Sequence, residues 1–119
     1  MKGIAAYQDT TITTQGKGRL IVMLYEGAIK FMKLAIREIE ARNWEQKHKY
    51  ILKAQEILLE LNSVLDMDAG GEVAANLRRL YFYMGRRLTE ANTKKDPEII
   101  REVIALAEEL NAGWKAIAN

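Results

Sequence analysis

Glu45 and His48 come closest to a catalytic motif, because Glu-x-x-His supplies ligands in carboxylate-bridged di-iron bundles. Such a site needs two of these pairs and two further carboxylates that project inward. The chain has a single histidine, so the second pair cannot exist. We therefore expect His48 to lie on a solvated surface, and we expect no metal or other cofactor.

Four arginines in two adjacent pairs, at 78–79 and 86–87, are the residues best suited to contact phosphate groups. Glu72 and Glu90 accompany them, and the net charge of the chain is only +2, which argues against nucleic acid as the main partner. The sequence contains no glycine-rich phosphate loop, no Ser–His–Asp set and no zinc-ligand spacing. We therefore expect neither an enzyme nor a nucleic-acid-binding protein.

The elements that position these residues are predicted to be helices. Apolar residues step by three and four along four stretches, at about 19–41, 43–65, 72–91 and 97–117. Nothing alternates with period two over a useful length, so no strand is expected. Four helices of this length with short connections predict an all-α fold, an antiparallel up-and-down four-helix bundle.

Several residues between these stretches are typical of helix ends. Asn43 is a favourable N-cap, and Gln46 has the spacing of the reciprocal partner in a capping box. Asp96 followed by Pro97 predicts another helix start. The adjacent glycines at 70–71 allow the positive φ that a tight reversal needs.

The first 18 residues differ in composition from the rest, and their Thr-rich stretch "DTTITTQG" shows no helical period. We expect residues 1–18 to be a flexible N-terminal arm on a bundle domain of residues 19–119. The arm lacks the long apolar centre of a secretory signal, and no apolar run is long enough to span a membrane. The chain also has no cysteine, which suits the cytosol. We expect a cytoplasmic protein without membrane insertion.

The predicted helices carry more apolar residues than one core-facing stripe requires. We expect the core stripes to include Leu24, Phe31, Leu77 and Leu110. The surplus apolar residues beside these stripes include Tyr25, Ile29, Leu52, Leu59, Val73, Leu80 and Tyr83. Either the core is broad, because each bundle helix touches two neighbours, or a groove accepts amphipathic helices of another chain. The pattern alone leaves both interpretations open, and under the second the surplus residues contact the partner.

Three segments carry a more specific signal: "LIVMLYEGAIKFM" at 20–32, "GGEVAANLRRLYFYMGRRLTEAN" at 70–92 and "GWKAI" at 113–117. Together with Leu65-Asp66 at the family's spacing before the glycine pair, they resemble the FliS family of flagellar secretion chaperones. The match covers nearly the whole chain, in order and in register. It is far more specific than any single short motif.

The resemblance implies a four-helix bundle that binds the disordered C-terminal segment of flagellin in the cytoplasm. Such chaperones prevent premature polymerisation of flagellin and deliver it to the flagellar type III export apparatus, with an export-gate component as a further partner. Ile4 and Tyr7 match an Ile-x-x-Tyr element of some members, in which the arm is a lid over part of the client surface.

We expect the free protein to be a monomer or a weak dimer. The alternative is a helical adaptor or regulator that dimerises through the same apolar faces and has no disordered client.

Overall fold

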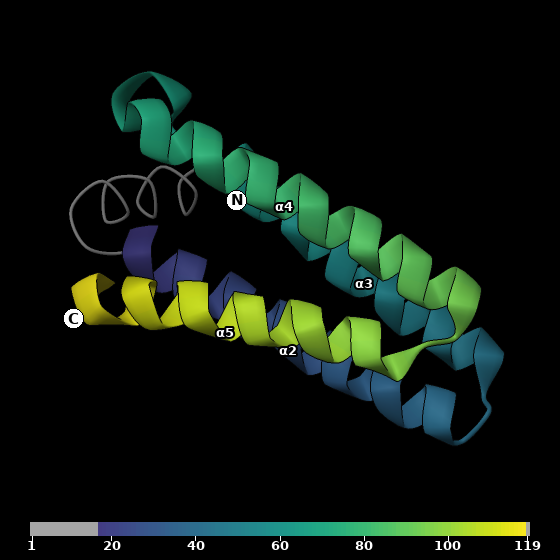
Figure 1. Cartoon of the computed structure of the whole chain (residues 1–119). Helices are drawn as coiled ribbons and strands as arrows, with labels where there is room; N and C mark the ends of the chain where they lie inside the picture. The colour runs from purple at the N-terminus through teal and green to yellow at the C-terminus, as the bar shows by residue number, and fades with distance from the viewer. Residues whose placement is uncertain (1–16, 119) are drawn as a thin grey trace, which may run out of the picture.

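The computed structural model describes residues 17–118, and these form four helices in the order that the sequence predicts. They are α2 (Lys17–Glu40), α3 (Trp44–Ser63), α4 (Met67–Lys94) and α5 (Pro97–Ala118). Each helix packs against the next, and α5 packs back against α2, so the four close into one bundle (Figure 1). The predicted all-α four-helix bundle is confirmed. No helix within the described residues is both long and apolar enough to cross a membrane.

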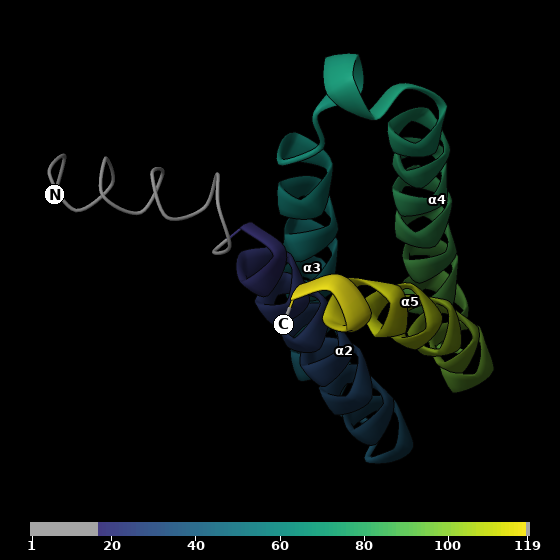
Figure 2. The ribbon, with the colours of Figure 1, turned by 90° about the vertical axis from the view of Figure 1, so that its left-hand side faces the viewer.

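In the view of Figure 1, α2 and α5 lie below α3 and α4, and we call these the two helix pairs, although α2 packs most extensively against α3. The pairs lie close together near the α2–α3 and α4–α5 connections, and they diverge toward the end where α4 begins. Figure 2 looks at that end and shows α4 standing apart from the ribbon of α2. One end of the bundle is therefore tighter than the other.

Polar contacts bind the tight end together. The Lys47 ammonium, buried on α3, donates hydrogen bonds to the main-chain oxygen of Asn92 on α4 at 2.9 Å and to its side-chain Oδ1 at 2.6 Å. Burial lowers the pKa of Lys47, and the nearby charge of Lys95 lowers it further. Arg101 of α5 forms an ion pair with Glu40 of α2 at 3.2 Å. These contacts join α3 to α4 and α2 to α5 close to the two connections.

The helix boundaries are set partly by the predicted signals. Gly71 has φ of 52° and ψ of −127°, so the reversal predicted at the glycine pair is confirmed at this residue. Asp66 caps the turn before it, because its Oδ1 accepts from the Ala69 amide at 3.0 Å. Asp96 likewise accepts from the Glu98 amide at 2.9 Å. The capping box predicted at Asn43 is wrong: its side chain makes no capping hydrogen bond.

The core runs along the middle of the bundle and contains large side chains from all four helices. Those fully withdrawn from solvent are Tyr25, Met32, Ile51, Leu61, Met84, Leu88, Ile100 and Val103. Within it the Tyr25 hydroxyl of α2 lies 2.5 Å from the Tyr81 hydroxyl of α4. Burial is the main cause that raises the pKa of both tyrosines. The hydroxyls therefore remain neutral at ordinary pH and join α2 to α4.

Four residues expected in the core stripes lie at the edge of the observed core. Leu24, Phe31, Leu77 and Leu110 pack against the core but are only partly buried. Helix α2 packs against both α3 and α5. Its most buried line therefore lies between the two apolar stripes, and both stripes contribute to the core. The core is therefore broad, which is one of the two interpretations that the sequence pattern allows for the surplus apolar residues.

Candidate functional site

The residues predicted to contact a partner do not form one surface. Tyr25 has an exposed fraction of 0% and Ile29 of 9%, so the prediction that they form an open stripe is wrong. The physical reason is the double packing of α2 against α3 and α5, which buries both of its apolar stripes. Ile4 and Tyr7 lie outside the described residues.

Leu52 and Leu59 remain exposed, and both lie on the flank of α3 that faces α4. Between them Gln55 donates from Nε2 to the Gly85 carbonyl of α4 at 3.0 Å and to the Thr89 hydroxyl at 2.8 Å. These two bonds span the helices at a point where Gly85 offers no side chain. The amide contact fixes the spacing between α3 and α4, and it leaves a hollow on the side of Leu59.

The α3–α4 groove, as we call this hollow, has a volume of about 350 Å³ and is lined by Gln55, Leu58, Leu59, Asn62, Tyr81, Phe82, Gly85, Arg86 and Thr89. Its apolar rim is Leu59 from α3, 62% exposed, and Phe82 from α4, 42% exposed. The Arg78 guanidinium lies 5.5 Å from the centre of the Phe82 ring, which is cation–π range. The Oδ1 atom of Asn62 is buried in the groove and has no hydrogen-bond partner among residues 17–118.

Phe82 is absent from the predicted site, although its position was informative. It falls on a different line of its helix from the core stripe and from Val73, Leu80 and Tyr83. Helical spacing places Arg78, Gly85 and Thr89 on the same flank as Phe82, and two of these contact Gln55 of α3. The aromatic side chain of Phe82 among these mostly polar positions was therefore the available signal for a groove on the flank of α4 that faces α3.

Val73, Leu80 and Tyr83 lie on the opposite flank of α4. The same helical line continues to Arg87, which pairs with Glu102 of α5 at 2.8 Å. Val73 and Tyr83 are exposed and Leu80 is partly buried. These three side chains therefore form a separate surface on the α5 side of α4, and they do not line the α3–α4 groove.

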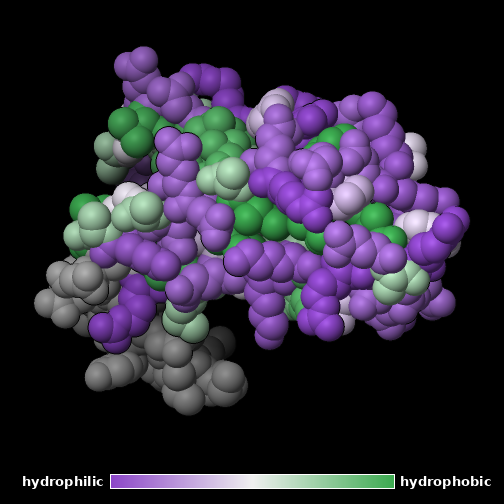
Figure 3. All heavy atoms as spheres, turned by 60° about the horizontal axis from the view of Figure 1, so that its bottom comes forward, coloured by the Kyte–Doolittle hydropathy of each residue, from purple (hydrophilic) through white to green (hydrophobic). Residues whose placement is uncertain are grey.

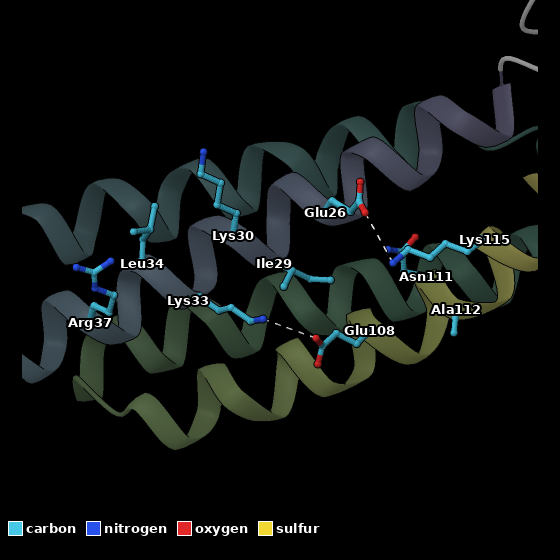
Figure 4. Close-up of a pocket in the computed structure, with 10 residues that line it drawn as sticks. All are labelled: Glu26, Ile29, Lys30, Lys33, Leu34, Arg37, Glu108, Asn111, Ala112 and Lys115. Carbon is cyan, nitrogen blue, oxygen red and sulfur yellow. Dashed lines mark ion pairs between the residues drawn. The ribbon is translucent and has the colours of Figure 1, made fainter.

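A second cavity of about 540 Å³ lies between α2 and α5, and we call it the α2–α5 cleft (Figure 4). Its lining residues are Glu26, Ile29, Lys30, Lys33, Leu34, Arg37, Glu108, Asn111, Ala112 and Lys115. Figure 3, with the lower side of Figure 1 turned forward, shows hydrophilic residues flanking a band of hydrophobic ones. The two hollows thus differ in character: the α3–α4 groove has an apolar rim and the α2–α5 cleft a charged one.

The chemistry available at these surfaces is that of binding. No three His, Cys, Asp or Glu side chains within residues 17–118 are grouped closely enough to hold a metal ion. His48 is exposed on α3, where its Nδ1 lies 2.8 Å from the Asn92 amide nitrogen, and Glu45 pairs instead with Lys49 at 3.8 Å. The Glu45–His48 pair is therefore part of a solvated surface, as predicted.

Comparison with known proteins identifies the family. The model of the family described as "Flagellar protein FliS" matches residues 1–119. The flagellar secretion chaperone FliS of Bacillus subtilis is 38% identical over 110 residues, which are 92% of this chain and 81% of the relative. FliSB of Pseudomonas aeruginosa is 38% identical over 123 aligned positions, spanning 100% of this chain and 98% of the relative.

The flagellar secretion chaperone FliS of Salmonella typhimurium is 35% identical over 121 aligned positions, covering 98% of this chain and 90% of the relative. These relatives are named as chaperones, which is a non-enzymatic role and agrees with the chemistry predicted from the sequence. The matched region contains all four helices and the motifs at 20–32 and 70–92. The chain belongs to the FliS family.

Proposed function

We propose that this protein is a cytosolic export chaperone that binds the disordered C-terminal segment of flagellin. In this role it prevents premature polymerisation and delivers flagellin to the flagellar type III export apparatus, where a component of the export gate receives the complex. Support comes from relatives that are named flagellar secretion chaperones and from the open apolar surface of the bundle.

The observation that carries the proposal is the α3–α4 groove, where Leu59 and Phe82 stay exposed beside a hollow. An amphipathic helix laid between them would cover both side chains. Complete burial of a Leu or Phe side chain is worth about 1.5–3 kcal/mol, so covering the open part of each contributes about 1 kcal/mol. A client that folds on this groove loses chain entropy on binding. Contacts beyond these two side chains are therefore also needed.

Charge placed on the groove tests the proposal. Leu59→Asp should weaken binding of a flagellin C-terminal peptide by about 2 kcal/mol or more, because the bound client would bury an unpaired carboxylate. The free protein should keep its stability, since Leu59 is already 62% exposed. Isothermal titration beside thermal melting measures both quantities.

Met23→Asp is the matched control, because Met23 on α2 is 61% exposed but does not line the groove. Equal loss of affinity in the two variants would contradict a client site between α3 and α4. Far-ultraviolet circular dichroism of the mixture should also exceed the sum of its parts in helix signal. A mixture that equals that sum while binding would show that the client does not fold on the groove.

A helical adaptor that dimerises through exposed apolar side chains is the alternative, and Val73 and Met67 near the start of α4 are open enough to support it. Light scattering behind gel filtration separates the two functions. A monomer that forms a one-to-one complex with the peptide supports the chaperone. A stable dimer that ignores the peptide supports the adaptor.

A further inference from the structure

The α2–α5 cleft contains a buried polar group without a partner. Asn111 of α5 is only 3% exposed, and its Oδ1 accepts no hydrogen bond from any described residue. Leaving a buried amide oxygen unpaired is unfavourable, so such a group in a cleft indicates a missing donor. In Figure 4 Asn111 extends from α5 toward α2, beside the Glu26 and Lys115 side chains.

The rim of the same cleft is rich in positive charge. Lys30, Lys33 and Arg37 follow one another along α2, and Lys115 of α5 lies beside Glu26 at one end of the cleft (Figure 4). The lining has four cationic side chains against two carboxylates. Charge complementarity therefore favours an acidic occupant.

The carboxylates on the rim neutralise this charge only in part. Lys33 lies 3.8 Å from Glu108, and Lys115 lies 3.7 Å from Glu26. Both separations exceed ordinary hydrogen-bond length, and all four side chains are more than half exposed. Among the described residues Lys30 and Arg37 form no ion pair. Two cations thus remain available to a ligand.

The shape and floor of the cleft narrow the choice of occupant. Its volume of about 540 Å³ and its apolar floor of Ile29, Leu34 and Ala112 suit a few residues of peptide rather than a bare ion. A side-chain amide has one acceptor and two donors, the groups that complement a main-chain N–H and C=O. In a helix those main-chain groups are already paired, whereas in an extended segment they are free.

We propose that the α2–α5 cleft binds an acidic protein segment in extended conformation. For this contact the Asn111 side chain turns toward the cleft, since its Oδ1 is closed off in the free protein, and the main chain of the segment then donates to that oxygen. The carboxylates of the segment face Lys30 and Arg37, and its apolar side chains lie on Ile29 and Leu34. The site is separate from the α3–α4 groove, so it can be occupied while a client is bound there.

The test uses a fluorescein-labelled peptide with acetylated N-terminus and the sequence Glu-Leu-Glu-Leu-Glu, with Lys-Leu-Lys-Leu-Lys as the opposite-charge peptide. Fluorescence anisotropy at low salt should show binding of the first peptide alone. Arg37→Glu should weaken it by about tenfold, the effect of losing one ion pair and gaining one repulsion. Arg79→Glu makes the same charge change on α4, away from the cleft, and should leave affinity within about twofold.

Asn111→Leu tests the main-chain contact. It keeps the volume of the side chain and removes the unpaired amide, so the variant should melt at the same or a higher temperature and still lose at least about fivefold in peptide affinity. Asn111→Ala provides the same test should the larger side chain fail to fit. Unchanged affinity in a folded Asn111 variant overturns the assigned contact, and equal losses in Arg37→Glu and Arg79→Glu overturn the site.

A flagellin C-terminal peptide added to saturation separates this site from the proposed client groove. The acidic peptide should remain bound, and Leu59→Asp should leave its affinity unchanged. Displacement by the flagellin peptide would show that the cleft belongs to the client site and would overturn an independent second site. Failure of flagellin to bind at all would contradict the proposed function, while the Arg37 and Asn111 results would still decide the cleft.

Discussion

The hydroxyl pair in the core makes a prediction about the coupling between two residues. The Tyr25 and Tyr81 hydroxyls lie 2.5 Å apart, and both side chains are buried. Tyr25→Phe therefore leaves the Tyr81 hydroxyl buried without its partner. We expect a loss of about 1–3 kcal/mol in the free energy of unfolding.

Tyr81→Phe should lower the free energy of unfolding by a similar amount, because it leaves the Tyr25 hydroxyl without its partner. The double variant should lose less than the sum of the two single losses, because neither hydroxyl of the pair then remains. The two substitutions should therefore couple by about 1 kcal/mol in a double-mutant cycle.

Urea unfolding followed by far-ultraviolet circular dichroism measures these differences, with Tyr50→Phe as the control. Tyr50 stacks on Phe31 and forms no hydrogen bond through its hydroxyl among the described residues, so its substitution should change stability by less than about 0.5 kcal/mol. The dependence of the unfolding free energy on urea should be unchanged in all variants. A coupling near zero, or single losses no larger than that of the Tyr50→Phe control, would refute the hydroxyl pair.

Three further predictions concern alkaline pH, the non-helical residue Gly71 within α4 and the arm. Burial raises the pKa of Tyr25 and Tyr81 in the folded state, so the stability they contribute is complete below the unfolded value of about 10 and is lost as pH rises above it. Unfolding free energies at about pH 8 and 11 should therefore differ less in the Tyr25→Phe/Tyr81→Phe protein than in wild type. Gly71→Ala should lower the free energy of unfolding by about 1–3 kcal/mol, because a φ of 52° with ψ of −127° is restricted to glycine. Gly113 lies in open space on α5, so Gly113→Ala should instead raise the free energy of unfolding by about 0.5–1 kcal/mol in the same urea titration. Deletion of residues 1–16 should leave the helix signal of the bundle intact and keep or tighten flagellin-peptide affinity if Ile4 and Tyr7 compete with the client, whereas lost affinity would make the arm part of the site.

Helices and their order could be predicted from the sequence because each helix satisfies its own main-chain groups and carries its own apolar period. Asp66, Gly71 and Asp96 act within a few residues of their own positions, so their roles are also visible locally. Asn43 shows the limit even there. It occupies the N-cap position of α3, as its residue type predicts, but its side chain makes no capping hydrogen bond.

The faces of the helices could be predicted less well, because a single sequence does not say on which side each neighbour lies. Two adjacent apolar stripes on α2 are both consistent with one core, and only the packing of α3 and α5 decides that Tyr25 is buried. The α3–α4 groove depends on Gln55 reaching Gly85 across 30 positions of sequence. Leu59 was predicted because it breaks the core pattern, whereas Asn111 gave no signal, since an isolated Asn in a helix is ordinarily solvated.

The uneven spacing of the two helix pairs has a consequence for local opening of the bundle. Lys47 and Arg101 hold the helices together beside the α2–α3 and α4–α5 connections, whereas Met23, Met67, Val73 and Ile117 are exposed toward the other end. Local opening needs less free energy where fewer buried contacts break. Amide hydrogens should therefore exchange in a gradient along each helix, slowest near residues 36–54 and 84–104 and fastest near the start of α4 and the end of α5. A transient opening of this kind separates the helices at the start of α4 and the end of α5, while the helix ends beside the α2–α3 and α4–α5 connections stay packed.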